Sequence, residues 1–161
     1  MPSADHVDSW YAATRNDATR YPALTGRLTA DVCIIGAGYS GLQTAIELAQ
    51  RGYQVVVVEA RRVGWGGSGR NGGQVCTAYA AGMETIEGWM GREDARRLFE
   101  LAEEAKEILC QRIERFKIDC DLTQGYLLAA ASPREVRECE EWLESADRDY
   151  GYSSLELIRG Q

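Results

Sequence analysis

The sequence predicts an α/β fold in which parallel strands alternate with a helix, and three consecutive segments support this prediction. The first is a short apolar run over residues 32–35, typical of a strand covered on both faces. The second segment repeats apolar residues at helical spacing, and we expect these to face the sheet: Leu42, Ala45, Ile46 and Ala49. The third, residues 55–58, is four valines and suits a central parallel strand.

A glycine-rich turn, Gly36-Ala37-Gly38-Tyr39-Ser40-Gly41, joins the first strand to the helix. Gly36 allows a sharp exit from the strand, Gly38 leaves the backbone open to a phosphate, and Gly41 allows close helix–sheet packing. The free N–H groups and the positive dipole end of the helix would meet the same phosphate. Glycine triplets also occur in ligand-free loops. The ordered strand, turn, helix, Gly52 helix stop and second strand favour a Rossmann-like dinucleotide-binding unit.

An acidic residue, Glu59, ends the second strand about 20 residues after the turn, where such folds bind the ribose. An acid at this position favours a free ribose 2′-hydroxyl over a 2′-phosphate, and therefore FAD or NAD over NADP. Arg61 and Arg62 follow closely and weaken this preference.

Six of the ten residues from 64 to 73 are glycine. Glycine-rich stretches are commonly flexible linkers. Trp65, Arg70 and Asn71 argue against a linker here, as does the position directly after Glu59. Glycines permit close approach of a long cofactor to the backbone, and Ser68, Arg70 and Asn71 can supply hydrogen bonds.

The flanking segments carry weaker predictions. A short helix is expected over residues 9–14, within a polar lead-in, and a long helix is expected from Gly91. Its apolar stripe is Leu98, Leu101, Ala105, Ile108, Leu109, Ile113 and Phe116, with a Glu93–Arg97 pair on the other face. Residues 122–130 resemble a strand or hairpin arm, and residues 155–158 a last short strand. Between them, Ser132, Pro133 and Glu135 begin a helix whose stripe is Val136, Cys139, Leu143, Ala146 and Tyr150.

Composition limits the function classes. The 161 residues are enough for one domain with a hydrophobic core, and 45% hydrophobic content argues against disorder. A net charge of −7 argues against a nucleic-acid partner. The five cysteines form no CxxC pair and indicate free thiols in a reducing compartment. The single histidine, His6, argues against a histidine metal site or a Ser-His-Asp triad, and no metal is expected. Without a signal pattern or a membrane span, we expect a soluble, cytoplasmic protein.

The turn and residues 59–74 together resemble the D-amino-acid oxidase superfamily of FAD-dependent amine oxidoreductases, and within it the γ-glutamylputrescine oxidase branch. The lead-in and the Gly125–Ala129 segment resemble that branch as well. The resemblance implies an incomplete Rossmann-like, three-layer FAD-binding fold with the start of a mixed-sheet substrate domain. The expected parts are a lead-in at 1–30, FAD-binding residues at 31–118, and the beginning of the substrate domain at 119–161.

The resemblance also implies the cofactor contacts. The turn would hold the FAD pyrophosphate, Glu59 the adenosine ribose, and Arg70, Asn71 and Gly72 would lie nearest the isoalloxazine. The expected FAD-binding residues are Gly36, Ala37, Gly38, Tyr39, Ser40, Gly41, Glu59, Ala60, Arg61, Gly67, Ser68, Arg70, Asn71, Gly72 and Gly73. No catalytic residue is assigned.

The chemistry implied for a small-molecule amine is hydride transfer from the carbon bearing the nitrogen to flavin N5, hydrolysis of the imine and reduction of oxygen to peroxide. Glycine, sarcosine or D-amino acids are alternative substrates. An NAD-binding reductase module and a non-catalytic nucleotide-binding fragment are alternative functions.

Family members are much longer than this chain, which therefore resembles an amino-terminal part lacking the carboxy-terminal part of its own fold. We accordingly expect open sheet edges, an exposed apolar sheet face and weak or absent catalysis by the chain alone.

Overall fold

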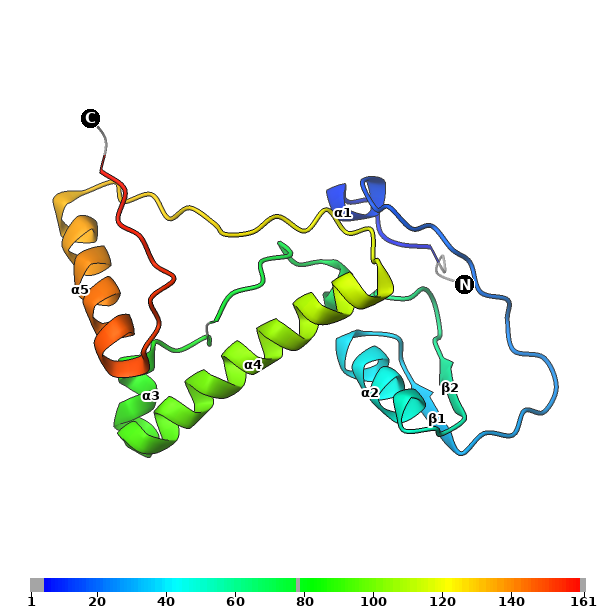
Figure 1. Cartoon of the computed structure of the whole chain (residues 1–161). Helices are drawn as coiled ribbons and strands as arrows, with labels where there is room; N and C mark the ends of the chain where they lie inside the picture. The colour runs from blue at the N-terminus through cyan, green and yellow to red at the C-terminus, as the bar shows by residue number, and fades with distance from the viewer. Residues whose placement is uncertain (1–4, 78, 160–161) are drawn as a thin grey trace. The chain divides into compact units, whose positions relative to one another are not determined.

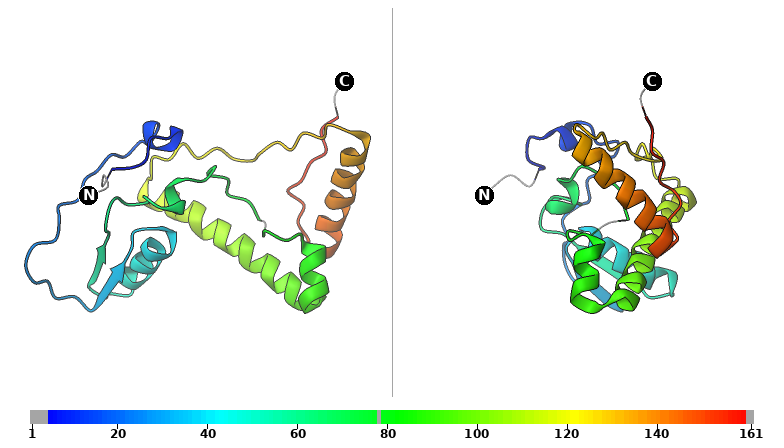
Figure 2. Two further views of the ribbon diagram at one scale, coloured as in Figure 1. Left: turned by 180° about the vertical axis from the view of Figure 1, so that it is seen from behind. Right: turned by 90° about the vertical axis from the view of Figure 1, so that its left-hand side faces the viewer.

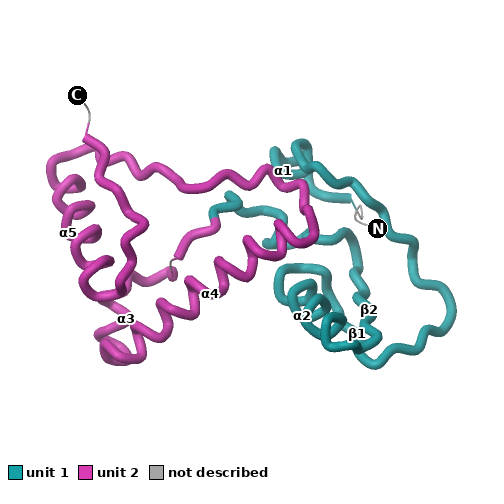
Figure 3. Tube along the Cα trace, viewed as in Figure 1, with its two compact units in different colours: residues 1–74 teal, residues 75–161 magenta. Residues whose placement is uncertain are grey.

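A computed structural model describes residues 5–77 and 79–159 of the chain. The described residues belong to two compact units, residues 1–74 and residues 75–161 (Figure 3). Unit 1 contains α1 (Trp10–Ala13), β1 (Val32–Ile35), α2 (Tyr39–Gln50), β2 (Val55–Val58) and the 3₁₀ turn η1 (Gly67–Gly69). Unit 2 contains α3 (Met83–Met90), α4 (Arg92–Phe116) and α5 (Pro133–Tyr150) (Figure 1).

Unit 1 is built on a βαβ arrangement, as the hydrophobic pattern predicts. β1 and β2 pair in parallel, with Val32 opposite Val55 and Ile35 opposite Val58. α2 connects them and lies along one face of this two-stranded sheet (Figure 2). The helix ends at Gln50, and Gly52 follows its cap residue with φ of +89°, the left-handed conformation that glycine adopts without strain. The mixed α/β character and the small parallel sheet are therefore confirmed.

In the described ranges β1 is left uncovered on its other face, which corrects the expectation that it is covered on both faces. Burial alternates along β1: Val32 and Ile34 are half-buried, whereas Cys33 and Ile35 are exposed. Ile35 is 89% exposed, because α2 covers only the opposite face. The predicted exposed apolar face is confirmed at β1 only, because the four valines of β2 are half-buried. Ala49 is also exposed and does not face the sheet.

The helices of unit 2 begin and end largely where their capping residues predict. Ser132 caps α5 by accepting a hydrogen bond from the Glu135 N–H at 3.3 Å, and Pro133 occupies the first helical position. The Glu135 carboxylate accepts from the Ala131 N–H at 2.6 Å. This is one residue earlier than a standard capping box requires. Gly91, with φ of +84°, ends α3 and precedes α4. The sequence pattern did not indicate α3.

Unit 2 packs around a small apolar cluster where α3, the first turns of α4 and the end of α5 meet (Figure 1). Ile86, Ala95, Phe99 and Ala146 are buried there, and the Phe99 and Tyr150 rings lie 4.7 Å apart. The α5 stripe is confirmed, since its five residues are buried or half-buried. The α4 stripe is only partly right: Leu98, Leu109 and Ile113 are half-buried, but Leu101, Ala105, Ile108 and Phe116 are exposed.

Two predicted strands are absent from the described residues. Residues 122–130 and 155–158 are neither strand nor helix. A β-strand is stabilised by ladder hydrogen bonds to a neighbour, and in the described ranges neither segment has a strand beside it. The described core is also smaller than one domain of this length requires, because its buried hydrophobic residues number five. None of the helices in residues 5–77 and 79–159 is long and apolar enough to cross a membrane.

Candidate cofactor-binding site

The glycine turn after β1 has the conformation that its sequence predicts. Gly36 has φ of +100°, and its N–H donates to the Val58 carbonyl at 2.8 Å, so that β2 fixes the start of the turn. Ala37 is 2% exposed. A Cβ on Gly41 would lie under 3.0 Å from the Gly36 carbonyl oxygen. Only glycine therefore fits at position 41, because the helix backbone rests directly on the turn.

The first turn of α2 presents backbone donors. Its N-cap residue is Gly38, which offers no side-chain acceptor to them. The Tyr39 N–H instead donates to the Ser68 hydroxyl oxygen at 3.0 Å. Within the described residues the N–H groups of Ser40 and Gly41 have no hydrogen-bond acceptor. Free N–H groups and the helix dipole make this point favourable for an anion such as a phosphate.

Glu59 lies directly against this turn. Its Oε2 accepts a hydrogen bond from the Ala37 N–H at 2.8 Å, and its Oε1 accepts from the Arg61 N–H at 2.9 Å. The residue is exposed, and a carboxylate has acceptor positions for about four hydrogen bonds. The carboxylate can therefore bind the two N–H groups and still accept from a hydroxyl group of a ligand.

The glycine-rich segment 64–73 is folded onto the turn and is not an independent linker. The Gly64 N–H donates to the Ala37 carbonyl at 2.9 Å. Within η1, a Cβ on Gly69 would lie under 3.0 Å from the Gly64 carbonyl oxygen, whereas a Cβ on Gly67 would meet nothing within 4 Å. Packing therefore requires glycine at position 69 but not at position 67.

Asn71 ties this segment to α2. Its Nδ2 lies 2.9 Å from the Tyr39 hydroxyl oxygen, 3.0 Å from the Ser68 carbonyl and 3.3 Å from the Gly67 carbonyl. Its Oδ1 accepts from the Gly73 N–H at 3.0 Å. The amide therefore bridges α2, η1 and the residues that follow η1. These contacts use both its NH₂ donor and its carbonyl acceptor, which an amide side chain combines.

Trp65 is surrounded by cationic groups. The guanidinium carbons of Arg61 and Arg70 lie 3.7 Å and 4.4 Å from the centre of its ring. Its indole N–H donates to the Asp5 carbonyl at 3.0 Å. The Asp5 carboxylate pairs with Arg62, and the hydrogen bond from Arg62, together with the charge of Arg20, lowers the pKa of Asp5. Sequence reasoning missed Asp5, because 57 residues separate it from Arg62 and no motif links them.

The structure brings most of the predicted site residues together in unit 1. Residues 36–41, Glu59, Arg61 and residues 67–71 are joined by the contacts described above. Ala60 is exposed and is not joined to the turn by any hydrogen bond in the described ranges. Gly72 faces the side chain of Gln74, whose Oε1 is close to where a Cβ would stand, and Gly73 has φ of +72°.

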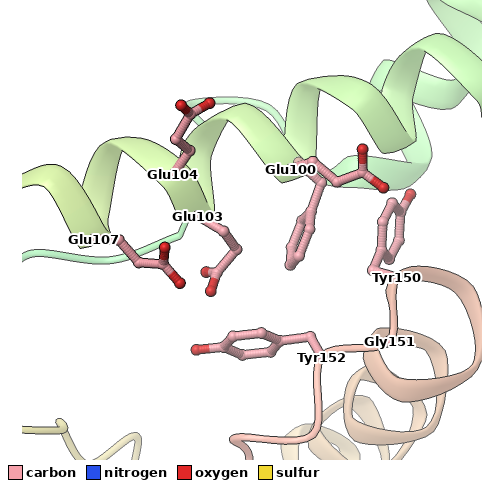
Figure 4. Close-up of a pocket in the computed structure, with 8 residues that line it drawn as sticks. Glu100, Glu103, Glu104, Glu107, Tyr150, Gly151 and Tyr152 are labelled. Atoms are coloured by element: carbon pink, nitrogen blue, oxygen red, sulfur yellow. The ribbon is translucent and has the colours of Figure 1, made fainter.

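Unit 2 contains a separate cavity of about 270 Å³ beside α4 (Figure 4). Phe99, Tyr150 and Tyr152 line it together with four carboxylates, those of Glu100, Glu103, Glu104 and Glu107. The nearby Lys106 ammonium donates to Glu103 at 2.7 Å and to Thr77 Oγ1 at 3.0 Å. Burial alone would lower the pKa of Lys106, but Glu103 and Tyr152 outweigh burial and raise it. In the described ranges no three His, Cys, Asp or Glu side chains are placed to hold a metal ion.

Comparison with known proteins gives a family match for most of the chain. Residues 31–161 match the family described as "DAO: FAD dependent oxidoreductase". No solved structure matches the chain.

Three curated proteins illustrate the similarity. The chain is 42% identical to the "Gamma-glutamylputrescine oxidoreductase" of Escherichia coli, over 96% of the chain and 36% of that protein. It is 37% identical to the "Probable oxidoreductase OrdL" of Haemophilus influenzae, over 95% of the chain and 36% of that protein. It is 45% identical to the "D-amino acid dehydrogenase 2" of Pseudomonas aeruginosa, over 40% of the chain and 17% of that protein. The chain thus spans about a third of the length of the first two relatives.

Proposed function

The chain belongs to the DAO family of FAD-dependent oxidoreductases, and from this membership we propose that unit 1 holds FAD and that the protein oxidises a C–N bond of an amine or amino acid. The observation that carries the proposal is the convergence of three segments on residues 36–39, the turn and the first residue of α2. The Gly36–Gly41 turn, the Glu59 carboxylate and the Ser68 hydroxyl are all joined there by hydrogen bonds of 2.8–3.0 Å.

These residues fit the parts of FAD. The N–H groups at the start of α2 suit its pyrophosphate, and the close packing at Gly41 leaves room for no side chain there. Glu59, with acceptor capacity remaining, suits the hydroxyl groups of the adenosine ribose. Ser68, Arg70 and Asn71 are proposed to line the path toward the isoalloxazine, as are Ala60, Arg61, Gly67, Gly72 and Gly73.

The βαβ unit is proposed to begin a Rossmann-like, three-layer FAD-binding fold, with the substrate domain beginning at residue 119. When bound, the flavin supplies the hydride-accepting chemistry that oxidation of an amine needs. This chain's own residues bind and orient the cofactor, through the backbone donors of α2 and the carboxylate of Glu59. The five cysteines are free, which supports a reducing compartment and, we propose, the cytoplasm.

We propose a γ-glutamylputrescine-type amine as the substrate, because the relative of that name is 42% identical over 96% of the chain. D-amino acids are the second candidate, since a D-amino acid dehydrogenase is 45% identical over 40% of the chain. The exposed sheet face at Ile35 supports the further proposal that the chain alone turns over substrate weakly or not at all.

The test is equilibrium binding of FAD, NAD⁺ and NADP⁺ to the 161-residue chain, followed by flavin fluorescence or by competition. We expect FAD to bind most tightly, and Gly41→Ala to abolish that binding. Gly88→Ala is the matched control, because a Cβ at this α3 position meets nothing within 4 Å. Tighter binding of NAD⁺ than of FAD would favour a reductase module, and absence of FAD binding would overturn the proposal.

A further inference from the structure

We propose that Trp65 is a positioning residue that holds the guanidinium groups of Arg61 and Arg70 as uncompensated positive charges beside the pyrophosphate site. This inference rests on the proposed function, because it assigns the anion that these charges meet to the diphosphate of FAD. Trp65 itself would touch neither cofactor nor substrate. It acts through the two arginines that lie over its ring.

The ring is a fixed support. The Trp65 backbone N–H donates to the Arg62 carbonyl at 3.0 Å, and its indole N–H donates to the Asp5 carbonyl at the same distance. The Trp65 carbonyl accepts from Arg70 Nε at 3.0 Å. Three hydrogen bonds therefore hold the residue on both sides of its backbone and at the outer edge of its ring.

The two arginines are held by the ring and not by carboxylates. Their guanidinium carbons lie 3.7 Å and 4.4 Å from the ring centre, well inside the distance of about 6 Å at which cation–π attraction operates. Within the described ranges the guanidinium group of neither arginine forms an ion pair. The Asp5 carboxylate, on the residue whose carbonyl accepts from the Trp65 indole, pairs with Arg62 and Arg20 instead, and Glu59 meets Arg61 through its backbone N–H.

This arrangement has an electrostatic consequence. A carboxylate partner would neutralise an arginine, whereas an aromatic ring orients it and leaves its full charge for an anion. The two positive charges near one ring repel each other, and a dianion bound beside them would offset this repulsion. The electrostatic free energy is therefore lowered most when a dianion binds. In a chain with net charge −7, such a local positive region adds to the attraction that the first turn of α2 exerts on a diphosphate.

The experiment compares FAD binding by wild type, Trp65→Phe and Trp65→Leu at several salt concentrations. Phenylalanine keeps an aromatic face, whereas leucine keeps only apolar volume. We expect Trp65→Leu to weaken FAD binding about tenfold and to flatten its salt dependence, with Trp65→Phe in between. Trp89→Leu is the control, since Trp89 lies in α3 and is 72% exposed. Circular dichroism checks that each variant remains folded.

The outcomes separate this inference from the proposed function. If wild type binds no FAD, the proposed function fails. If wild type binds FAD and Trp65→Leu binds it with the same affinity and salt dependence, only the inference fails. Equal weakening by the Phe and Leu variants with an unchanged salt dependence would show a packing role for Trp65, and would also overturn the inference.

Discussion

The Glu59 carboxylate accepts a hydrogen bond from the Ala37 backbone N–H, with Oε2 2.8 Å from the nitrogen, although the two residues are 22 positions apart. The acid at the end of β2 is thereby fixed to the turn at the end of β1. Its second oxygen accepts from the Arg61 N–H at 2.9 Å. The carboxylate therefore joins the two strand ends as well as facing the proposed ribose position.

Replacing Glu59 with Gln tests this double role. A carboxamide has one acceptor oxygen, so one of the two N–H groups would face its NH₂ group and lose its partner. We expect a destabilisation of about 1–3 kcal/mol and roughly tenfold weaker FAD binding. Hydrogen exchange at the Ala37 amide, measured together with FAD titration, checks the result. Glu84→Gln in α3 is the control. Unchanged Ala37 protection with unchanged affinity would contradict the expectation.

The two glycines of η1 provide a matched pair of variants. A Cβ on Gly69 would lie under 3.0 Å from the Gly64 carbonyl oxygen, whereas one on Gly67 meets nothing within 4 Å. We expect Gly69→Ala to shift the segment, break the Ser68–Tyr39 hydrogen bond and cost about 1–3 kcal/mol. Gly67→Ala should behave like wild type. Thermal unfolding and FAD affinity measure both effects, and equal behaviour of the two variants would show that this packing is unimportant.

Substitutions of Asn71 test whether a hydrogen-bond donor is needed between α2 and η1. In Asn71→Asp, a carboxylate oxygen would face the carbonyls of Gly67 and Ser68, neither of which can donate. We expect Asn71→Asp to be more destabilising than Asn71→Ala, by about 1–3 kcal/mol. Protonation of the new carboxyl would restore a donor, which raises its pKa in the folded state above the unfolded value of about 4. The difference should therefore shrink as the pH falls toward that value and be gone below it. A pH-independent difference, measured by chemical unfolding, would rule out this explanation.

Local sequence carried most of the information about unit 1. The Gly36–Gly41 turn and the Gly52 stop have backbone requirements that few other residues meet, and both lie as predicted. The four valines form a parallel strand as predicted, but in the described ranges β2 pairs with β1 alone and is not a central strand. The contacts of Asn71 with Tyr39 and of Asp5 with Trp65 could not be predicted, because they join distant positions without a shared motif. Side-chain chemistry suggested that Asn71 mattered but not what it would bind.

Predictions failed where a segment depends on a neighbour. Residues 122–130 resemble a strand in composition but have no paired strand in the described ranges, and Leu127 is 79% exposed. Burial of β1 was predicted from its apolar residues, yet an apolar side chain is buried only where another element covers it. The same reason explains the exposed residues of the α4 stripe. The composition of a segment shows which side chains could be buried, but the elements packed against the segment determine which of them are buried.

The raised pKa of Tyr150 predicts how the stability of unit 2 changes at high pH. Burial, a hydrogen bond to the Glu87 carboxylate, and the charges of Glu87 and Asp149 raise the pKa of Tyr150 to about 12, while Arg92 opposes them. Because the folded pKa exceeds the unfolded value of about 10, the stabilisation is complete below pH 10 and is lost as the pH rises through 12. Tyr150→Phe cannot ionise, so its stability difference from wild type, about 1 kcal/mol at pH 8, should disappear across this range. Urea unfolding followed by circular dichroism at each pH measures the difference, with Tyr53→Phe as the control at an exposed site. A stability difference that stays constant up to pH 12 would mean that ionisation of Tyr150 does not affect the free energy of unfolding.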